Sequence, residues 1–348
     1  MEKGKAIRVA VNGYGVIGKR VADAVAAQDD MQLAGVADVT LDWRARIVTG
    51  KGFRLFGATT ERAEAMAKSG LEVAGSLEDL LAGADIVVDC TPKHVATGNV
   101  ETYRRKGIKF IVQGGEKHSV TGHSFVAEAS YETALGRDCT RVVSCNTTSI
   151  VRTLSALKRA GLLARARGTL LRRATDPWES HLGGIMNTLV PEAEIPSHQG
   201  PDARSVDPDL DVITMAVKVP ETLAHMHYWS VQLARKAEKD EILEAFCSSP
   251  RIALVRMSDG LTAINAIKEL MADLGRPHDN LYEVALWSDM LKVEGDELFY
   301  AYMVDNQAIV IPETIDAIRA LTGFQADARA SIAQTNASLK IGQLNLRA

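Results

Sequence analysis

Cys145 has the setting that best suits covalent chemistry. It lies directly after a strand predicted at 141–144 and before a helix predicted at 146–160. Unpaired N–H groups at a helix N-terminus stabilise a thiolate, so we expect the pKa of this thiol to fall toward neutrality. Thr147 and Thr148 add hydroxyl donors suited to an anion or oxyanion. We therefore predict a nucleophile at Cys145; the alternative is the common role of cysteine as a small buried hydrophobic residue.

A glycine-rich turn near the N-terminus matches the pattern G-x-G-x-x-G. Its residues, 13–18 (GYGVIG), follow a strand predicted at 7–11 and precede a helix predicted at 19–28. In such a turn the first glycine permits the bend, the second lets the backbone approach a pyrophosphate, and the third allows close helix–strand packing. The helix N-terminus directs its N–H groups at the diphosphate. We predict cofactor binding by Gly13, Gly15, Val16, Ile17 and Gly18; a strand–helix turn without a ligand is the alternative.

Asp38 ends the next predicted strand, at 32–37, about twenty residues after the glycine turn. A carboxylate there accepts hydrogen bonds from the adenosine ribose and repels a 2′-phosphate, which favours NAD over NADP. Arg44 and Arg46 follow closely and could soften this preference, so NADP stays open. The alternative is a water-exposed aspartate at the entry to a loop.

A thiolate and a nicotinamide cofactor together indicate the oxidation of an aldehyde. The thiolate would form a hemithioacetal, a hydride would leave to the cofactor, and a thioester would remain.

The elements that must position these residues follow two different patterns of predicted secondary structure. The first 145 residues or so alternate short apolar strands with helices, which predicts a parallel sheet of the Rossmann type. Ser76 and Asp79 resemble a capping box at the start of a helix predicted at 76–82. The strands predicted here are 7–11, 32–37, 86–89, 108–112 and 141–144.

The later part of the chain predicts an α+β domain with a mainly antiparallel sheet. Its predicted strands are 170–173, 212–219, 225–233, 252–257, 282–287 and 298–304, and its predicted helices are 241–246 and 261–274. Two final helices, 312–321 and 326–339, are expected to return to the first domain. We thus predict an α/β protein with an NAD(P)-binding Rossmann domain at 1–144, a catalytic domain at 145–311 and C-terminal helices at 312–348.

Composition excludes several classes of protein. The 348 residues include 40 Lys+Arg and 44 Asp+Glu, a net charge of −4 that gives no general attraction to nucleic acid. No apolar run approaches the ~18 residues of a membrane span, and the N-terminus does not resemble a signal peptide. Four cysteines are too few for a disulfide scaffold, so we expect reduced thiols in the cytoplasm. We expect no metal.

Several motifs together resemble the archaeal-type phosphorylating glyceraldehyde-3-phosphate dehydrogenases, over nearly the whole chain. They are 11–20 (VNGYGVIGKR), 113–117 (QGGEK), 144–148 (SCNTT), 195–198 (IPSH), 225–227 (HMH) and 311–320 (IPETIDAIRA). The order Ser-Cys-Asn-Thr-Thr differs from the Ser-Cys-Thr-Thr-Asn of the bacterial and eukaryotic branch.

The resemblance implies that Cys145 is the nucleophile and that His225 is the base that activates it and then shuttles protons. The residues alone do not decide which histidine is the base, because His225 and His227 lie two apart on a predicted strand and share a face. Either could line the pocket, and a strand histidine without this context is more often structural.

The resemblance also implies the binding residues. Ser144, Asn146, Thr147, His198 and Gln199 fall where the family holds the triose phosphate. Arg172 is our choice for a phosphate ligand, because its forked donors match phosphate oxygens. By resemblance Arg173 reaches the cofactor and Gly115 borders the nicotinamide. Salt bridges at a domain interface are the alternative for the two arginines.

Three departures from the family pattern bear on specificity. Many relatives have lysine at Asp38, and its absence strengthens the NAD interpretation. Many have a second histidine at Gln199, so this position must act through an amide. Asn306 stands where the family has a cofactor-binding glutamine, and its amide offers a donor and an acceptor with shorter reach.

The leading hypothesis is reversible oxidation of D-glyceraldehyde 3-phosphate with inorganic phosphate to 1,3-bisphosphoglycerate, coupled to NAD(P), in glycolysis or gluconeogenesis. A related acyl-phosphate reductase such as aspartate-semialdehyde dehydrogenase remains an alternative. So does a non-catalytic NAD(H)-sensing protein, which would lack reactive-thiol chemistry. The resemblance implies a homotetramer.

Overall fold

The computed structural model describes residues 6–113, 115–177, 185–342 and 344. These residues form two compact units. Unit 1 is Met1–Val143 with Ile311–Leu339, and unit 2 is Ser144–Val310 with Lys340–Ala348. Within the described residues, no helix combines the length and apolarity needed to cross a membrane.

Unit 1 is built on a seven-stranded sheet in the order β3-β2-β1-β4-β5-β7-β6. Every neighbouring pair is parallel, as predicted for a Rossmann-type sheet. The strand order reverses between β1 and β4, the place where such sheets bind a dinucleotide. The strands are β1 (Ile7–Asn12), β2 (Met31–Asp38), β3 (Leu55–Gly57), β4 (Ile86–Asp89), β5 (Lys109–Val112), β6 (Ser124–Phe125) and β7 (Cys139–Val142).

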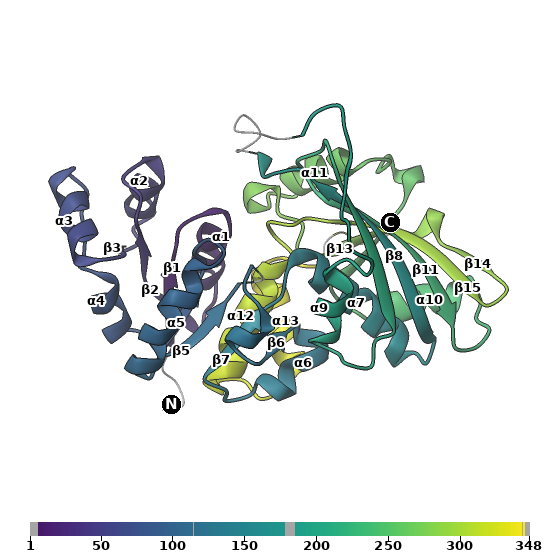
Figure 1. Cartoon of the computed structure of the whole chain (residues 1–348), viewed down its shortest axis with the longest axis horizontal. Coiled ribbons are helices and arrows are strands. Elements are labelled where there is room, and N and C mark those ends of the chain that lie inside the picture. Colours follow the sequence, from purple (N-terminus) through teal and green to yellow (C-terminus); the bar gives the residue numbers. More distant parts are fainter. Residues whose placement is uncertain (1–5, 114, 178–184, 343, 345–348) are drawn as a thin grey trace. The chain divides into compact units, whose positions relative to one another are not determined.

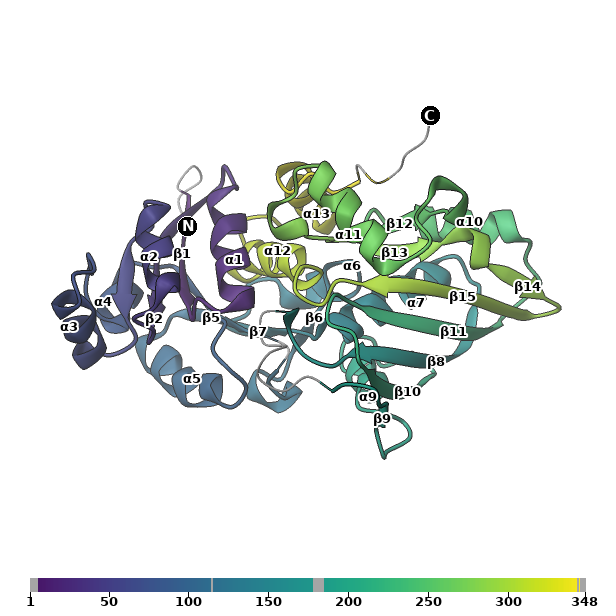
Figure 2. The same cartoon turned by 90° about the horizontal axis from the view of Figure 1, so that it is seen from above.

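Helices cover both faces of this sheet. An apolar cluster that includes Leu80, Val87, Val100 and Phe110 packs α4 and α5 onto one face, and Figure 2 shows α1 on the other. Ser76 caps α4 in the predicted box with Asp79. The helices are α1 (Val16–Ala26), α2 (Trp43–Gly50), α3 (Thr60–Lys68), α4 (Leu77–Ala82), α5 (Val95–Lys106), α6 (Ala127–Ala134), α12 (Val310–Thr322) and α13 (Ala328–Ser338).

Unit 2 contains an eight-stranded sheet in the order β12-β13-β15-β11-β8-β10-β9, with β14 paired to β15. The pairs β8–β10 and β12–β13 are parallel and the others antiparallel, so the sheet is mainly antiparallel as predicted. Figure 1 shows β8, β11 and β15 side by side. The strands are β8 (Leu163–Arg173), β9 (Val190–Pro191), β10 (Val212–Val219), β11 (His225–Leu233), β12 (Ile252–Val255), β13 (Val284–Trp287), β14 (Lys292–Glu294) and β15 (Glu297–Val304).

The central helix of unit 2, α7 (Cys145–Arg159), is buried along most of its length and packs on β8 and β15. It also contacts α9 (Gln199–Arg204) and α10 (Lys239–Cys247). α11 (Ile264–Asp273) packs through Ile267 and Met271 against β13 and β15. Because side chains alternate along a strand, β11 buries His225 and His227 on one face and exposes Tyr228 on the other.

Several predicted boundaries differ from the observed ones by one to three residues, and two strand boundaries affect the residues that carry the site. The strand predicted at 141–144 is β7, which ends at Val142, so an extended two-residue step separates it from Cys145. The strand predicted at 170–173 is the end of the much longer β8, whose exposed, charged first half hides its strand pattern. Helices α2, α3, α5 and α6 were not predicted. They are short or largely polar, so they show little of the apolar periodicity that marks a helix.

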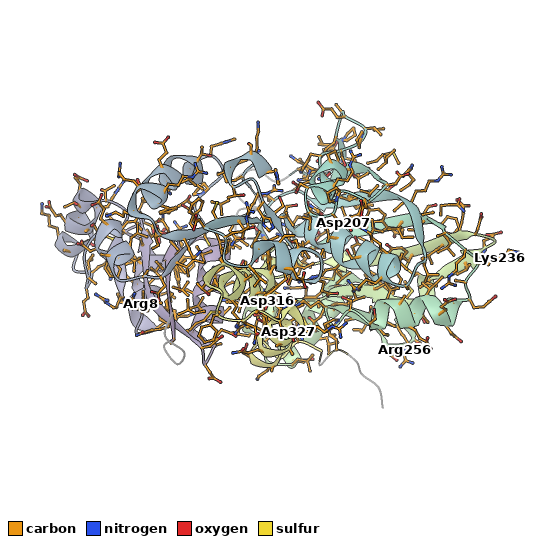
Figure 3. All side chains as sticks on the ribbon, turned by 90° about the horizontal axis from the view of Figure 1, so that it is seen from below. Arg8, Asp207, Lys236, Arg256, Asp316 and Asp327 are labelled. Atoms are coloured by element: carbon orange, nitrogen blue, oxygen red, sulfur yellow. The ribbon has the colours of Figure 1, made fainter. Side chains whose placement is uncertain are left out.

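A buried polar network joins the C-terminal helices α12 and α13 to the rest of unit 1. Arg319 on α12 pairs with both carboxylate oxygens of Asp30, at 2.7 and 2.9 Å, and donates to Gln28 at 2.7 Å and to Thr335 at 2.6 Å. Asp316, labelled in Figure 3, accepts bonds from Ser331 and Thr335 on α13. The side chain of Arg319 is fully buried, so its charge depends on these partners.

Replacing Arg319 by methionine should therefore lower the free energy of unfolding by about 3 kcal/mol, because Asp30 is left buried without its counter-charge. Urea denaturation followed by circular dichroism measures the loss. As a control, Arg329→Met, at an exposed position on α13, should have a free energy of unfolding within about 0.5 kcal/mol of that of the unchanged protein. A loss below about 1 kcal/mol at Arg319 would contradict the network.

Candidate functional site

The glycine turn has the geometry of a diphosphate-binding loop. Gly13 has a φ of +94°, and a Cβ there would lie 2.9 Å from the carbonyl of Cys90. A Cβ on Gly18 would lie 1.8 Å from the Gly13 oxygen, so only glycine allows this packing. Gly15 precedes α1 as its N-cap, and a Cβ there would meet nothing within 4 Å. The backbone is thus open to a phosphate where α1, starting at Val16, presents its N–H groups.

Asp38, at the end of β2, is only 8% exposed, so the water-exposed alternative is wrong. Its Oδ2 accepts the N–H of Tyr14 at 2.5 Å, and its Oδ1 accepts those of Val39 and Thr40 at 2.7 and 2.8 Å. Backbone N–H groups therefore occupy three of the roughly four lone-pair positions of the Asp38 carboxylate. Asp38 fixes the glycine turn and retains about one position for a ribose hydroxyl.

The positive charges near Asp38 are partly paired. Arg44 donates to both carboxylate oxygens of Asp42, at 2.6 to 3.1 Å. Lys19, 5.6 Å from the centre of the Trp43 ring, has a lowered pKa, because of burial and then of the nearby charges of Arg20, Arg44 and Lys51. The turn therefore lies in a positive environment, which suits an anionic cofactor.

Cys145 is the first residue of α7, and Ser144 is the N-cap. Burial raises the pKa of the Cys145 thiol to about 11. The charges of Arg173 and Arg172 and the N–H of Asn146 act in the opposite direction but do not outweigh burial. The prediction of a pKa near neutrality is therefore wrong for the chain itself, because loss of water exceeds the helix-terminus effect.

His225 lies at the start of β11 beside the same two arginines. Its Nδ1 accepts the backbone N–H of Arg173 at 3.0 Å. Burial, then the charges of His227, Arg173 and Arg172, hold the pKa of His225 well below its usual value. The ring is therefore neutral, and because Nδ1 accepts, its proton lies on Nε2.

His227 is committed to a different network. Its Nε2 lies 2.9 Å from Oδ1 of Asn146, and its Nδ1 lies 2.9 Å from the hydroxyl of Tyr302. Burial lowers its pKa to about 3, so it stays neutral. Both ring nitrogens are used, which makes His227 a positioning residue for Asn146. The structure thereby separates two histidines that the sequence left equivalent.

Each of the two predicted anion-binding arginines contacts a carboxylate. Arg172 forms an ion pair with Glu192, whose other oxygen lies 3.4 Å from Nδ1 of His198. Arg173 donates to Asp176 at 2.8 Å, and Gln307 donates to the same oxygen at 2.6 Å. The Nε atoms of both arginines are buried without a partner.

The loop that carries His198 and Gln199 is fixed to β10. The hydroxyl of Thr214 receives bonds from Ser197 Oγ at 2.8 Å and from the N–H of Gly200 at 2.9 Å. Gln199 is fully buried, and neither its amide oxygen nor its amide nitrogen has a partner. A buried amide with no partner is costly, which indicates a polar ligand or ordered water at this position.

Ser144 and Thr147 are tied to neighbouring elements. Their hydroxyl oxygens lie 2.9 Å apart, and Thr147 donates to Asp202 on α9 at 2.7 Å. A phosphate contact by the Thr147 hydroxyl would require that bond to be exchanged.

The remaining predicted cofactor contacts fall in both units. Asn306 follows β15, and its buried Oδ1 has no partner. Its neighbour Asp305 acts electrostatically on Cys145, so Asn306 belongs to the same region of unit 2. Gly115 is exposed in unit 1, while Gly114 lies outside the described residues. No group of three or more His, Cys, Asp or Glu suited to a metal occurs in the described part of the chain.

Comparison with known proteins shows which family this chain resembles. Residues 144–274 match the model "Glyceraldehyde 3-phosphate dehydrogenase, C-terminal domain", and residues 7–134 match "Dihydrodipicolinate reductase, N-terminus". Proteins named glyceraldehyde-3-phosphate dehydrogenase are similar along their whole length. One from Methanobrevibacter smithii is 44% identical over 96% of this chain and 99% of its own, and one from Pyrobaculum calidifontis is 46% identical over 96% and 97%.

The chain belongs to the archaeal-type glyceraldehyde-3-phosphate dehydrogenase family. The resemblance inferred from motifs is thus confirmed. A Rossmann-type unit in this family supports a nicotinamide cofactor.

Several residues that shape the site in this family member were not predicted. Glu192, Asp176 and Asp202 lie in loops or a short helix with no distinctive spacing, and only the fold brings them to their partners. Tyr302 could have been found, because it lies on the buried face of β15 directly across from His227 on β11.

The raised pKa of Cys145 predicts slow alkylation of the free chain at pH 7. The rate with iodoacetamide should rise about tenfold per pH unit between pH 7 and 9, because only the thiolate reacts. Mass spectrometry of peptides separates Cys145 from Cys247, which is exposed and serves as the accessibility control. A rate at Cys145 that does not change over this range would mean that the thiolate is already formed.

Proposed function

We propose that this protein oxidises D-glyceraldehyde 3-phosphate with inorganic phosphate to 1,3-bisphosphoglycerate, reversibly and with NAD or NADP. The observation that carries the proposal is the position of Cys145 at the start of α7, within electrostatic reach of Arg172 and Arg173, which also act on His225. Membership of the family supports the same reaction. Unit 1 would bind the cofactor, and unit 2 would bind the aldehyde and phosphate.

The proposed reaction uses Cys145 as the nucleophile. Its sulfur adds to the aldehyde carbon, the thiol proton is transferred to the carbonyl oxygen, and a hemithioacetal forms. Loss of the hydride from that carbon, with loss of the hydroxyl proton, leaves a thioester; a phosphate oxygen then adds to the thioester carbonyl and expels the thiolate. When bound, the oxidised nicotinamide supplies the hydride acceptor. The residues proposed to bind it are Gly13, Gly15, Val16, Ile17, Gly18, Asp38, Gly115, Arg173 and Asn306.

His225 is the proposed proton-transfer residue. Its Nε2–H can donate to the oxygen that becomes negative as sulfur adds to the aldehyde. To accept a proton at Nε2, the ring must first move its own proton to Nδ1, which the Arg173 N–H opposes. Hydrogen-bond donation, without loss of the Nε2 proton, is therefore the favoured first role of His225. Base action at Nε2 requires the proton to move to Nδ1, with loss of the bond from the Arg173 N–H.

We propose that phosphate groups are bound by Arg172 with His198, Gln199, Ser144, Asn146 and Thr147. The support comes from unsatisfied donors. Arg172 has a buried Nε without a partner, and the amide of Gln199 is buried and unpaired. Asn146 is oriented by His227, which occupies its Oδ1 and leaves the amide N–H groups for a substrate oxygen.

We further propose a cytoplasmic homotetramer. The outward face of the eight-stranded sheet exposes Met215, Tyr228 and Phe299 at 45, 41 and 36%. The strand register places Met215 and Tyr228 on either side of Thr169, in one row of the sheet. Such an apolar face favours burial against a second copy. The four cysteines are all free, as in a reducing compartment.

The purified protein should reduce NAD only when the aldehyde and inorganic phosphate are both present. Cys145→Ser should lower turnover by at least about a thousandfold, because a hydroxyl cannot form the thioester. Absorbance of the reduced cofactor at 340 nm measures both. Cys247→Ser, at the exposed end of α10, is the control and should keep full activity.

Other outcomes identify the alternatives. Reduction without phosphate would indicate a non-phosphorylating dehydrogenase. Preference for aspartate semialdehyde would indicate the related reductase, and cofactor binding without turnover would indicate a sensor. Slow alkylation of Cys145 does not distinguish a sensor from an enzyme, because burial raises the pKa of this thiol in either case.

Asp38 is proposed to favour NAD. Asp38→Lys should shift the ratio of kcat/KM values toward NADP by at least about tenfold, because a cation replaces the charge that repels a 2′-phosphate. It should also lower the melting temperature, because three backbone N–H groups lose their acceptor. Asp38→Asn separates these effects by removing the charge while keeping an acceptor oxygen. An unchanged cofactor ratio in Asp38→Lys would refute the assignment.

A further inference from the structure

Glu192 places a carboxylate on two of the groups proposed to bind phosphate. It contacts the Arg172 guanidinium through one oxygen and lies 3.4 Å from Nδ1 of His198 through the other. Its backbone N–H donates to the carbonyl of Ala216 on β10 at 2.9 Å, so its position at the sheet edge is fixed while its side chain can rotate. Nothing in the local sequence marks this residue.

The partly buried charge of Arg172 explains why the Glu192 carboxylate lies against its guanidinium. Its side chain is 23% exposed, and burial lowers its pKa, so an isolated guanidinium at this place is unfavourable. The charge of neighbouring Arg173 adds to the cost. A carboxylate offsets both, and it uses the same forked donors that a phosphate would use.

The partners of Glu192 distinguish it from the carboxylate on the adjacent arginine. Asp176 receives bonds from Arg173 and from Gln307, which the proposed phosphate set does not include. Among the described residues, the Glu192 carboxylate contacts only Arg172 and His198. A phosphate dianion that takes these two groups therefore replaces both ion-pair contacts that Glu192 makes within the described part of the chain.

We propose that Glu192 is an internal competitor for a phosphate dianion: it occupies Arg172 and His198 until the phosphoryl group of the aldehyde or inorganic phosphate displaces it. This inference rests on the proposed function. Displacement costs every anion that takes these groups the same free energy. Only an anion whose own contacts with Arg172 and His198 exceed that cost binds measurably, which a dianion with three acceptor oxygens does more readily than a monoanion. Glu192 thus sets the minimum affinity that an anion needs at this place.

Glu192→Gln tests the proposal, because the amide keeps the size and loses the charge. Titration of the full-length protein with inorganic phosphate alone, by calorimetry, should give a Kd lowered by threefold or more, on the order of the coupling expected for a partly buried ion pair. Titration with chloride or formate as monoanions should show a similar relative gain, because every anion that takes these groups must displace the same carboxylate. Glu194→Gln, exposed on the same segment, should leave all affinities unchanged.

Steady-state kinetics identify the source of the phosphate group. A lowered KM for inorganic phosphate, with aldehyde saturating, assigns Arg172 and His198 to the attacking phosphate; a lowered KM for the aldehyde assigns them to its phosphoryl group. In either case kcat should stay within about twofold, because Glu192 touches no reacting atom in the proposal. Glu192→Asp, which is too short to reach both partners, should give an intermediate gain.

Three results would overturn the inference. An unchanged phosphate Kd in folded Glu192→Gln would mean that no competition exists. A raised Kd would make Glu192 a positioning residue that orients Arg172. A gain matched by Glu194→Gln would reduce the effect to general surface charge. If turnover is absent but the phosphate affinity still rises, the proposed function fails while the competition stands, so the two failures are distinguishable.

Discussion

The positive charge of Arg172 and Arg173, adjacent at the end of β8, is the constraint around which the site in unit 2 is organised. Both arginines act on Cys145 and on His225. They oppose the effect of burial on the pKa of the Cys145 thiol, and they add to burial in lowering the pKa of His225. Their charge must itself be balanced, and Glu192 and Asp176 supply the balance.

Burial works against the same chemistry. It raises the pKa of Cys145 to about 11, although the helix N-terminus, the Asn146 N–H and two arginines all favour the thiolate. A solvated site would give a more acidic thiol, but water would also hydrolyse a thioester and compete for a hydride. The thiol of the free chain is therefore neutral. For the proposed reaction, charge or hydrogen bonds added when ligands bind must lower its pKa, because the helix terminus alone does not.

The sequence predicted those features that depend on local pattern. The glycine turn, the capping box at Ser76 and the alternation along β11 each follow from neighbouring residues, and the structure has them where expected. Desolvation is not local, so the sequence correctly placed Cys145 between a strand and a helix but misjudged the pKa of its thiol. Long-range pairing is not local either: Tyr302 meets His227, and Glu192 meets Arg172, only because strands distant in sequence become neighbours.

Asp38, which the sequence predicted, and Glu192, which it did not, are carboxylates held by different kinds of donor. Asp38 accepts three backbone N–H bonds, and backbone donors at the end of β2 cannot leave without unfolding the turn. Glu192 is held by side chains alone, which can rotate onto another anion. A ligand can therefore add to Asp38 without displacing its backbone donors, whereas a ligand of Arg172 and His198 must replace Glu192. In the two proposals, the carboxylate of Asp38 selects between cofactors and that of Glu192 competes with anions, and the nature of the donor decides which.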